Sequence, residues 1–389
     1  MKEFYKPKLE VADIFRQFAH LLGPLPAPSR KVVRDILNCR TSALGGHIQK
    51  CDSCDFEKNS YNSCRNRHCP KCQFMARSRW VENRVEDLLP CQYFHVVFTL
   101  PSELRPLVRG NKRHSYDILF KAASQTLKEV ALNPKHLGAE IGCIGVLHTW
   151  GQNLMDHPHL HFIVPGGGLS LDKSKWLTCK RDYLLPIRVL SKVFRGKILS
   201  SFEQAFHKGK LGFYGELEDL AHPVNFNDLM IRCASKEFVV YAKEPFAGPQ
   251  QVIDYLGDYT HRIAISNYRL VGLEGENVVF KVRDKQNPAK KKLMRLHVRE
   301  FMRRFLLHVL PKGFVRIRHY GFLGSRSKNE KISIIRLIQG VVEKVKAAVK
   351  ETWEQTLLRL TGLDAKLCPE CQKGTMLDYH PLKLLLNSS

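Results

Sequence analysis

The sequence contains no run of about eighteen apolar residues, the length that a membrane-spanning helix needs. No amphipathic segment combines a basic face with a wide apolar one, as a membrane-surface helix would. The first twenty residues carry charges throughout, so we expect no secretory signal. Internal repeats and low-complexity segments are also missing. These absences predict a protein without a membrane partner and without a repeat architecture.

Acidic residues are scarce relative to basic ones. The chain has 37 Asp and Glu against 62 Lys and Arg, which gives a formal net charge of +25 at pH 7. Such a surface stands at positive potential and attracts polyanions. We therefore expect a nucleic acid as the partner.

The order of sequence patterns predicts an α+β fold. A chain of 389 residues is long enough for two or three domains with a sizeable core. Helical patterns cover residues 10–22, 29–40, 104–132, 184–206 and 250–263, and strand patterns cover 93–100, 141–150, 159–167, 176–179, 237–246 and 313–324. Segment 268–284 reads as a hairpin that turns at 274–277. Strands separated by helices and joined in hairpins favour a central antiparallel sheet with packed helices.

Twelve cysteines in a large chain without an export signal indicate reduced thiols and metal ligation. Cys51-x2-Cys54 and Cys69-x2-Cys72 are separated by fourteen residues, within a segment 47–85 that has too few apolar residues for a core. Two such knuckles can complete a tetrahedral Zn²⁺ site. We expect these four thiols to hold a structural zinc, with Cys64, His68 or His47 as possible substitutes. The singly placed Cys39, Cys91, Cys143, Cys179 and Cys233 read as small buried apolar residues.

Basic and aromatic side chains surround this zinc-binding segment. Aromatic Tyr61, Phe74 and Trp80 lie between the cations, a pattern typical of phosphate contact and base stacking. A solvated charged surface around the zinc is the alternative. A second basic run, 290–304, reads as a surface for the DNA backbone. The predicted DNA-binding residues are Arg65, Arg67, Lys71, Arg77, Arg79, Lys291, Lys292 and Arg295.

Histidines alternate along the predicted strand 159–167. His159 and His161 are two apart and therefore face the same side of the sheet, while Leu160 faces the other. Two parallel neutral imidazoles can hold one divalent cation. The third ligand has three candidates, His148, His157 and Gln152, of which we favour His148 because its strand can pair with this one in a hairpin.

Two tyrosines share one side of the predicted helix 250–263. Tyr255 and Tyr259 are four apart, hence about 40° apart around a helix. An ordinary amphipathic helix would also account for them. A phenolate near a cation can, however, attack a phosphodiester and leave a covalent phosphotyrosine with a free hydroxyl.

Three motifs together resemble a known family. "YNSCRNRHCPKCQ", "LHTWGQNLMDHPHLHFIVPGGG" and "YLGDYTHRIAISNYRL", in this order, resemble the rolling-circle transposases of bacterial insertion sequences, the insertion-sequence-91 type, within the HUH endonuclease class. The similarity spans roughly residues 10–325.

The resemblance implies a palm-like antiparallel sheet that carries His159 and His161 as the metal-binding pair, and it implies Tyr255 and Tyr259 as nucleophiles. It also implies Mg²⁺ or Mn²⁺ at the histidines, an N-terminal zinc-binding domain, single-stranded DNA at the element's ends and at the target, and a place in the bacterial cytoplasm at the nucleoid. We expect a zinc-binding domain over 1–90, a catalytic domain over 91–325 and a helical C-terminal region over 326–389.

The C-terminal region holds one more pair, Cys368-x2-Cys371, without a second pair beside it in the sequence. We interpret it as a remnant or truncated ribbon, with a second zinc site as the alternative. The predicted function is a DNA transposase that nicks and rejoins single strands through a 5'-phosphotyrosine. The alternatives are a plasmid or phage replication initiator of the same chemistry, or a zinc-containing DNA-binding regulator without catalysis.

Overall fold

The structure is a computed structural model that describes residues 7–72, 80, 84, 87–180, 182–246, 252, 264–284, 287, 290–341 and 351–382. Tyr255, Tyr259, Arg77 and Arg79 lie outside the described residues. Within the described chain, no helix has both the length and the apolar character needed to cross a bilayer.

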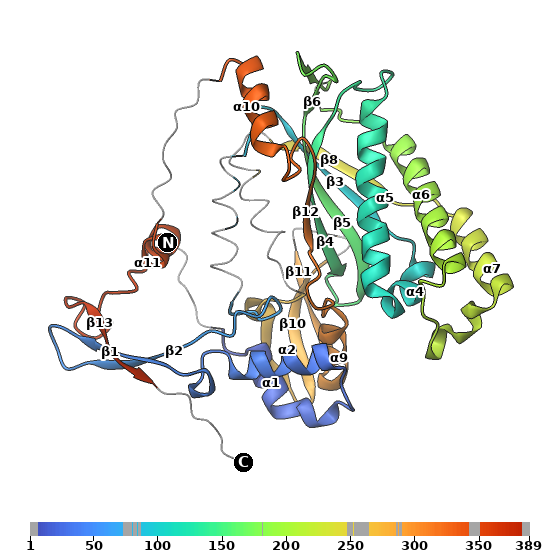
Figure 1. Ribbon diagram of the computed structural model, residues 1–389. Coiled ribbons are helices and arrows are strands. Elements are labelled where there is room, and N and C mark those ends of the chain that lie inside the picture. The colour runs from blue at the N-terminus through green and yellow to red at the C-terminus, as the bar shows by residue number, and fades with distance from the viewer. Residues whose placement is uncertain are drawn as a thin grey trace.

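The centre of the fold is a five-stranded antiparallel sheet with the strand order β12-β4-β5-β3-β8 (Figure 1). Its strands are β3 (Tyr93–Thr99), β4 (Gly142–Trp150), β5 (Asp156–Pro165), β8 (Val240–Phe246) and β12 (Ile317–Gly321). The predicted α+β class and the predicted hairpin between β4 and β5 are confirmed.

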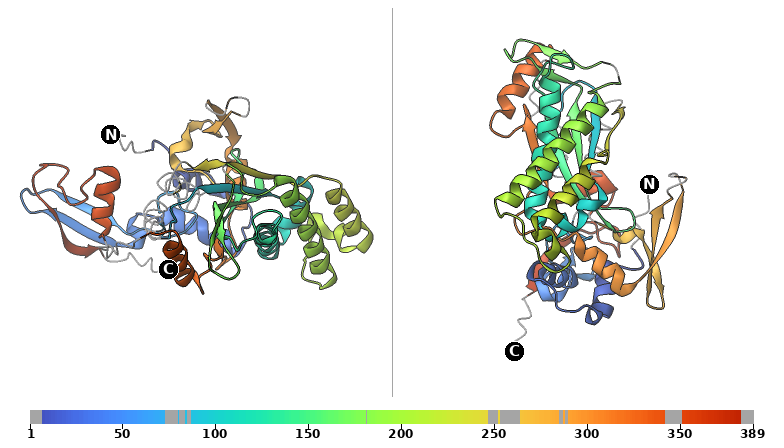
Figure 2. Two further views of the ribbon diagram at one scale, coloured as in Figure 1. Left: turned by 90° about the horizontal axis from the view of Figure 1, so that it is seen from above. Right: turned by 90° about the vertical axis from the view of Figure 1, so that its right-hand side faces the viewer.

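Helices cover one face of this sheet (Figures 1 and 2). They are α4 (Arg105–Gly110), α5 (Lys112–Leu132), α6 (Ile187–His207) and α7 (Pro223–Ala234). The period of two along β5 sends Leu160, Phe162 and Val164 into the core beneath these helices, where all three are fully buried. The same alternation places His159, His161 and Ile163 on the opposite face.

A second layer combines the two N-terminal helices with a three-stranded sheet. The helices α1 (Val11–Phe18) and α2 (Ala27–Asn38) share a core with β9 (Leu270–Glu274), β10 (Asn277–Arg283), β11 (Lys291–His297) and α9 (Val298–Leu307). The rings of Phe15 and Phe305 meet edge to face at 5.7 Å. The predicted N-terminal helices and the hairpin at 274–277 are confirmed. This core joins residues from the segments 1–90 and 91–325 that we expected to form separate domains.

The C-terminal region contains α10 (Lys328–Ile338), α11 (Trp353–Thr361) and, at the end of its described part, the strand β13 (Met376–Leu382). This strand pairs with β1 (Gly46–Cys51), which also pairs with β2 (Glu57–Tyr61). In Figure 1 and in the left view of Figure 2, this small sheet projects away from the rest of the described chain. The remaining elements are the short hairpin of β6 (Gly167–Leu169) and β7 (Trp176–Thr178), and the 3-10 turns Ala19–Leu21, Ser42–Leu44, Ser102–Leu104, Gly215–Ala221 and Asn267–Arg269.

Candidate metal centres

Three histidines meet on the face of the central sheet that α4 to α7 leave uncovered. His148 on β4 lies directly opposite His159 on β5, and His161 follows two residues later on the same face. The candidate ligand nitrogens of these three side chains all lie within 4.8 Å of one another. The hairpin register thus brings together the three histidines that we favoured as ligands. Among the described residues, His148 is the third member of the group that contains His159 and His161.

Hydrogen bonds orient two of the rings. Nδ1 of His159 donates to the carbonyl oxygen of His157 at 2.5 Å. Nδ1 of His161 and Nε2 of His95 are 2.8 Å apart, and the two rings stack with an angle of 9° between their planes. Because the carbonyl oxygen can only accept, the proton of His159 is on Nδ1 and its lone pair is on Nε2, the tautomer that binds a cation through Nε2. The contact with His95 selects the same tautomer of His161 when His95 is the acceptor.

Burial keeps His159 and the neighbouring His95 neutral. It lowers the pKa of His159 to about 4 and the pKa of His95 to about 3. Neutral imidazole is the form that ligates a divalent ion. His95 was not singled out from the sequence, because a lone histidine in the apolar run 93–100 reads as a core residue. A polar residue within an otherwise apolar strand was the only feature of the sequence that could have marked His95 as a site residue.

An apolar contact continues the same face beyond the histidines. Ile163 is the next residue after His161 on this face, and it packs with Tyr93 and the fully buried Val252. Val252 precedes Tyr255 by three residues.

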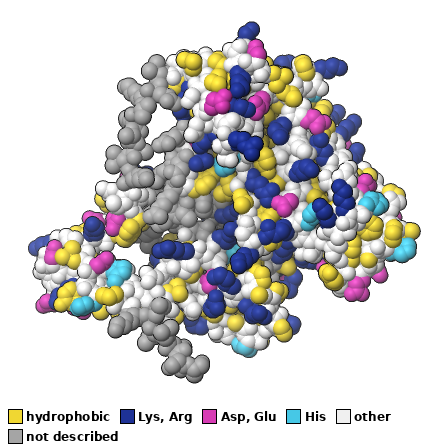
Figure 3. Space-filling model, in the orientation of Figure 1, with side chains coloured by type: hydrophobic (Ala, Val, Ile, Leu, Met, Phe, Trp, Pro, Cys, Tyr) yellow, Lys and Arg dark blue, Asp and Glu magenta, His cyan; other side chains and the backbone are white. Residues whose placement is uncertain are grey.

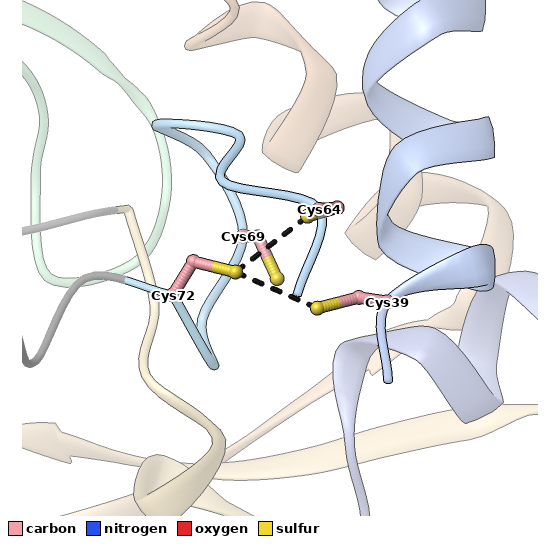
Figure 4. Close-up of side chains that lie close together, drawn as sticks. All are labelled: Cys39, Cys64, Cys69 and Cys72. Carbon is pink, nitrogen blue, oxygen red and sulfur yellow. Dashed lines mark hydrogen bonds between the residues drawn. The ribbon is translucent and has the colours of Figure 1, made fainter. Parts of the chain in front are cut away.

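A second centre consists of four thiols, one from the residue that follows α2 and three from the loop that follows β2 (Figure 4). The sulfur of Cys72 lies 3.5 Å from that of Cys39 and 3.6 Å from that of Cys64, and the Cys69 sulfur completes the group. Four sulfurs at 2.3 Å from a tetrahedral Zn²⁺ are about 3.8 Å apart, so the arrangement fits this ion. Hydrogen bonds from the other three thiols lower the pKa of Cys72, which provides the thiolate that zinc requires.

The predicted grouping of Cys51 and Cys54 with Cys69 and Cys72 is wrong. The structure places Cys69 and Cys72 beside Cys39 and Cys64, and it places Cys51 and Cys54 beside the C-terminal pair Cys368 and Cys371. The sequence spacing pointed to the nearest pair along the chain, whereas the pairing of β13 with β1 brings a distant pair closer.

Three further residues differ from their sequence interpretation. Cys39, expected as an isolated apolar residue, is a member of a thiol cluster. His68 and His47, the possible substitutes, have other partners: Nε2 of His68 accepts from the backbone N–H of Leu310 at 3.4 Å, and Nε2 of His47 lies 3.2 Å from Asp378.

Of the predicted DNA-binding residues that the structure describes, three have partners within the fold and three are exposed. Lys71 pairs with Glu10 at 2.7 Å and Arg67 donates to the carbonyl oxygen of Phe314 at 2.6 Å, so both contribute contacts within the fold. Arg295 pairs with Glu274 at the surface. Arg65, Lys291 and Lys292 are exposed. Figure 3 shows Lys and Arg side chains spread over one face of the molecule, with acidic side chains less frequent between them.

Comparisons with known proteins agree on one kind of protein. Residues 142–331 match a family model described as "Putative transposase", and residues 11–100 match one described as "Transposase zinc-binding domain". The "Putative transposase y4qJ" of Sinorhizobium fredii (strain NBRC 101917 / NGR234) is 47% identical over 374 residues, which cover 95% of this chain and 94% of that protein. The "Transposase for insertion sequence element IS801" of Pseudomonas savastanoi pv. phaseolicola is 30% identical over 330 residues, 79% of this chain and 74% of that protein. No solved structure matches the chain.

Proposed function

This chain belongs to the insertion-sequence-91 family of transposases, and from that premise we propose that it nicks and rejoins single-stranded DNA through a 5'-phosphotyrosine intermediate. In this proposal the three histidines hold a divalent cation, and Tyr255 and Tyr259 are the nucleophiles. The thiol cluster of Cys39, Cys64, Cys69 and Cys72 holds a structural Zn²⁺ within the zinc-binding domain.

The observation that supports this proposal most strongly is the position of Val252. Its side chain belongs to an apolar cluster with Tyr93 and Ile163, and Ile163 is on the face where His159 and His161 lie. Successive residues on one face of a strand are about 7 Å apart. Tyr255 follows Val252 by three residues in the sequence, and three residues of chain span at most about 11 Å. This contact supports the proposal that Tyr255 acts at the face that holds the histidine cluster.

His148, His159 and His161 would bind Mg²⁺ or Mn²⁺ through ring nitrogens, and the bound cation would neutralise charge on the scissile phosphate. The residues of the chain then act on that phosphate. The phenol oxygen of one tyrosine attacks phosphorus, the bond from phosphorus to O3' breaks, and the proton lost by the phenol ends on the departing 3'-hydroxyl. The products are a 5'-phosphotyrosine and a free 3' end.

Rejoining reverses this exchange. A 3'-hydroxyl attacks the phosphotyrosine, the new phosphodiester forms, and the phenol is released with a proton. Because the energy of the bond is conserved in the intermediate, the transfer requires no ATP. Two tyrosines allow one to hold a cleaved end while the other attacks a second strand.

The charge of the molecule suits this substrate. A net charge of +25 and the exposed cations Arg65, Lys291 and Lys292 provide contacts to a phosphate backbone without regard to sequence. Transposition acts on cellular DNA, so we place the protein in the bacterial cytoplasm at the nucleoid.

A covalent adduct tests the proposal. Labelled single-stranded oligonucleotides from the element's ends, incubated with the protein and Mn²⁺, should give a denaturant-resistant, protease-sensitive adduct. The adduct should disappear in the Tyr255→Phe, Tyr259→Phe double variant and in His159→Ala. Its persistence in the double variant would refute the nucleophile assignment, and its absence with every end sequence would favour a regulator without catalysis.

A further inference from the structure

A second cluster of four thiols combines a cysteine pair from the N-terminal part of the chain with a pair from the C-terminal region. The sulfurs of Cys51 and Cys371 are 3.7 Å apart, although 320 residues separate them in the sequence. The sulfurs of Cys54 and Cys368 are also 3.7 Å apart, and all four lie within 4.8 Å of one another. These separations match the edge of about 3.8 Å that a tetrahedral zinc–sulfur site requires.

The local backbone of both knuckles suits bound thiolates. The backbone N–H of Ser53 donates to the sulfur of Cys51 at 3.4 Å, and that of Gly374 donates to the sulfur of Cys371 at 3.3 Å. Hydrogen bonds of this kind stabilise the negative sulfur. Gly374 also makes room for the cluster, because a Cβ at this position would lie 2.5 Å from the sulfur of Cys51.

The three-stranded sheet around this cluster has almost no apolar core. Its buried residues are Cys51, Cys368 and Met376, with Phe56 partly buried beside them. The side chains of β2 and β13 are otherwise mostly exposed. A sheet with so little apolar burial is at best marginally stable, and small modules of this kind rely on a metal or a disulfide. No disulfide joins any of these four cysteines.

Polar contacts fix the register between β1 and β13. Strand β13 runs antiparallel to β1, with Cys51 opposite Met376 and Gly46 opposite Leu382. Gln49 donates to Asp378 at 3.0 Å, and Asp52 accepts from the backbone N–H of Thr375 at 2.8 Å. The C-terminal knuckle is therefore positioned by strand pairing as well as by its thiols.

We propose that Cys51, Cys54, Cys368 and Cys371 bind a second structural Zn²⁺, which fastens the C-terminal segment 366–382 to the zinc-binding domain. This site extends the domain beyond residues 11–100, the range that the family model matches. The zinc-binding domain of this chain is consequently completed by residues that follow the entire central sheet. This proposal does not depend on the nicking chemistry proposed above.

Cobalt substitution of the full-length protein tests the second site. Thiolate-bound Co²⁺ has a charge-transfer absorption that imidazole-bound Co²⁺ lacks, so the histidine centre does not contribute. We expect two thiolate-bound equivalents for the wild type and one for the Cys368→Ser, Cys371→Ser variant. The variant with Cys143→Ser and Cys233→Ser, two buried cysteines outside both clusters, should keep two. One equivalent in the wild type, or two in the Cys368→Ser, Cys371→Ser variant, would overturn the proposal.

Metal content and a milder variant complete the test. The protein as purified, washed to empty the histidine centre, should contain two zinc ions per chain; iron, or a disulfide among these four cysteines, would contradict the assignment. Gly374→Ala keeps every ligand but crowds Cys51, so a chelator should remove one of the two zinc ions at least tenfold faster. Gly272→Ala, where a Cβ meets nothing within 4 Å, should leave both rates unchanged. Equal rates in Gly374→Ala and wild type would count against the site.

Discussion

His95 contacts the histidine cluster although it is not one of the three predicted ligands. Nε2 of His95 lies 2.8 Å from Nδ1 of His161, and when His95 accepts the proton of this contact the lone pair of His161 is on Nε2. His95 is in this account a positioning residue, whose loss lets the His161 ring rotate and change tautomer.

We predict that His95→Ala weakens Mn²⁺ binding by about 10-fold to 100-fold, the range found when a partner of a ligating histidine is removed. Electron paramagnetic resonance of free Mn²⁺ measures the affinity. His95→Gln, which retains an acceptor, should recover part of the loss, and His114→Ala on α5 should have no effect. Equal affinities in His95→Ala and wild type would show that His95 serves packing alone.

His308 allows a prediction about pH. It is buried, its Nε2 lies 2.9 Å from the carbonyl oxygen of Leu154, and burial lowers its pKa from 6.5 to about 4. Between these two pH values the unfolded chain binds a proton that the folded chain does not, so the free energy of unfolding falls as the pH falls. At pH 5.5 the loss is on the order of 1 kcal/mol. Denaturant unfolding at pH 7 and pH 5.5 should therefore show a smaller decrease for His308→Gln than for the wild type, whereas identical decreases would contradict the prediction.

Some residues of the two metal centres could be predicted from the sequence and others could not. His159 and His161 were visible because a strand repeats every two residues, and His148 followed from a hairpin register. His95 and Cys39 were not visible, since each is a single residue whose partners come from other parts of the chain. A lone polar residue acquires its role only from tertiary contacts.

At the scale of elements, Val252 packs in an apolar cluster with Tyr93 and Ile163 of the central sheet, three residues before Tyr255 in the sequence. A carboxylate would be costly to bury in this cluster, so we expect the Val252→Asp side chain to leave it. We predict that Val252→Asp lowers the yield of the covalent adduct at least tenfold while Mn²⁺ affinity stays within twofold of the wild type.

Val239→Asp is the matched control for this change, because the side chain of Val239 is 61% exposed. It should retain the wild-type adduct yield. Loss of Mn²⁺ affinity in Val252→Asp would indicate general unfolding. A full adduct yield would contradict the claim that the contact of Val252 is needed for a tyrosine to act at the histidine face.

Elements with a strong hydrophobic period were predictable and those without one were not. Strands β3, β4 and β5 and helices α1, α2, α5 and α6 agree with their sequence patterns. Strand β13 was missed because its side chains are mostly exposed and its partner β1 precedes the central sheet. The basic segment 290–304 is a strand followed by a helix, β11 and α9, and all of its apolar residues except the exposed Leu293 belong to the second core.

At the scale of the whole molecule, the excess of positive charge should set the affinity for DNA. Affinity for a single strand falls with salt with a logarithmic slope of about 0.7 per phosphate contact. If Lys291 and Lys292 each contact a phosphate, Lys291→Gln with Lys292→Gln should reduce the slope by about 1.4. Fluorescence anisotropy at several salt concentrations measures it.

Lys208 and Lys210 provide the control, because they are also exposed but lie at the end of α6. Their double change to Gln removes the same charge and should leave the slope unchanged. An equal reduction in both variants would mean that net charge, rather than a DNA-binding surface at β11, determines the affinity.

The central claim is that a tyrosine carried to the histidine face attacks DNA beside a bound cation. Peptide mapping by mass spectrometry of the adduct formed with Mn²⁺ tests this claim most directly. The account predicts a nucleotide on the phenol oxygen of Tyr255 or Tyr259, and none when His159 and His161 are both changed to alanine. A nucleotide on any other residue, or an undiminished adduct without those histidines, would contradict it.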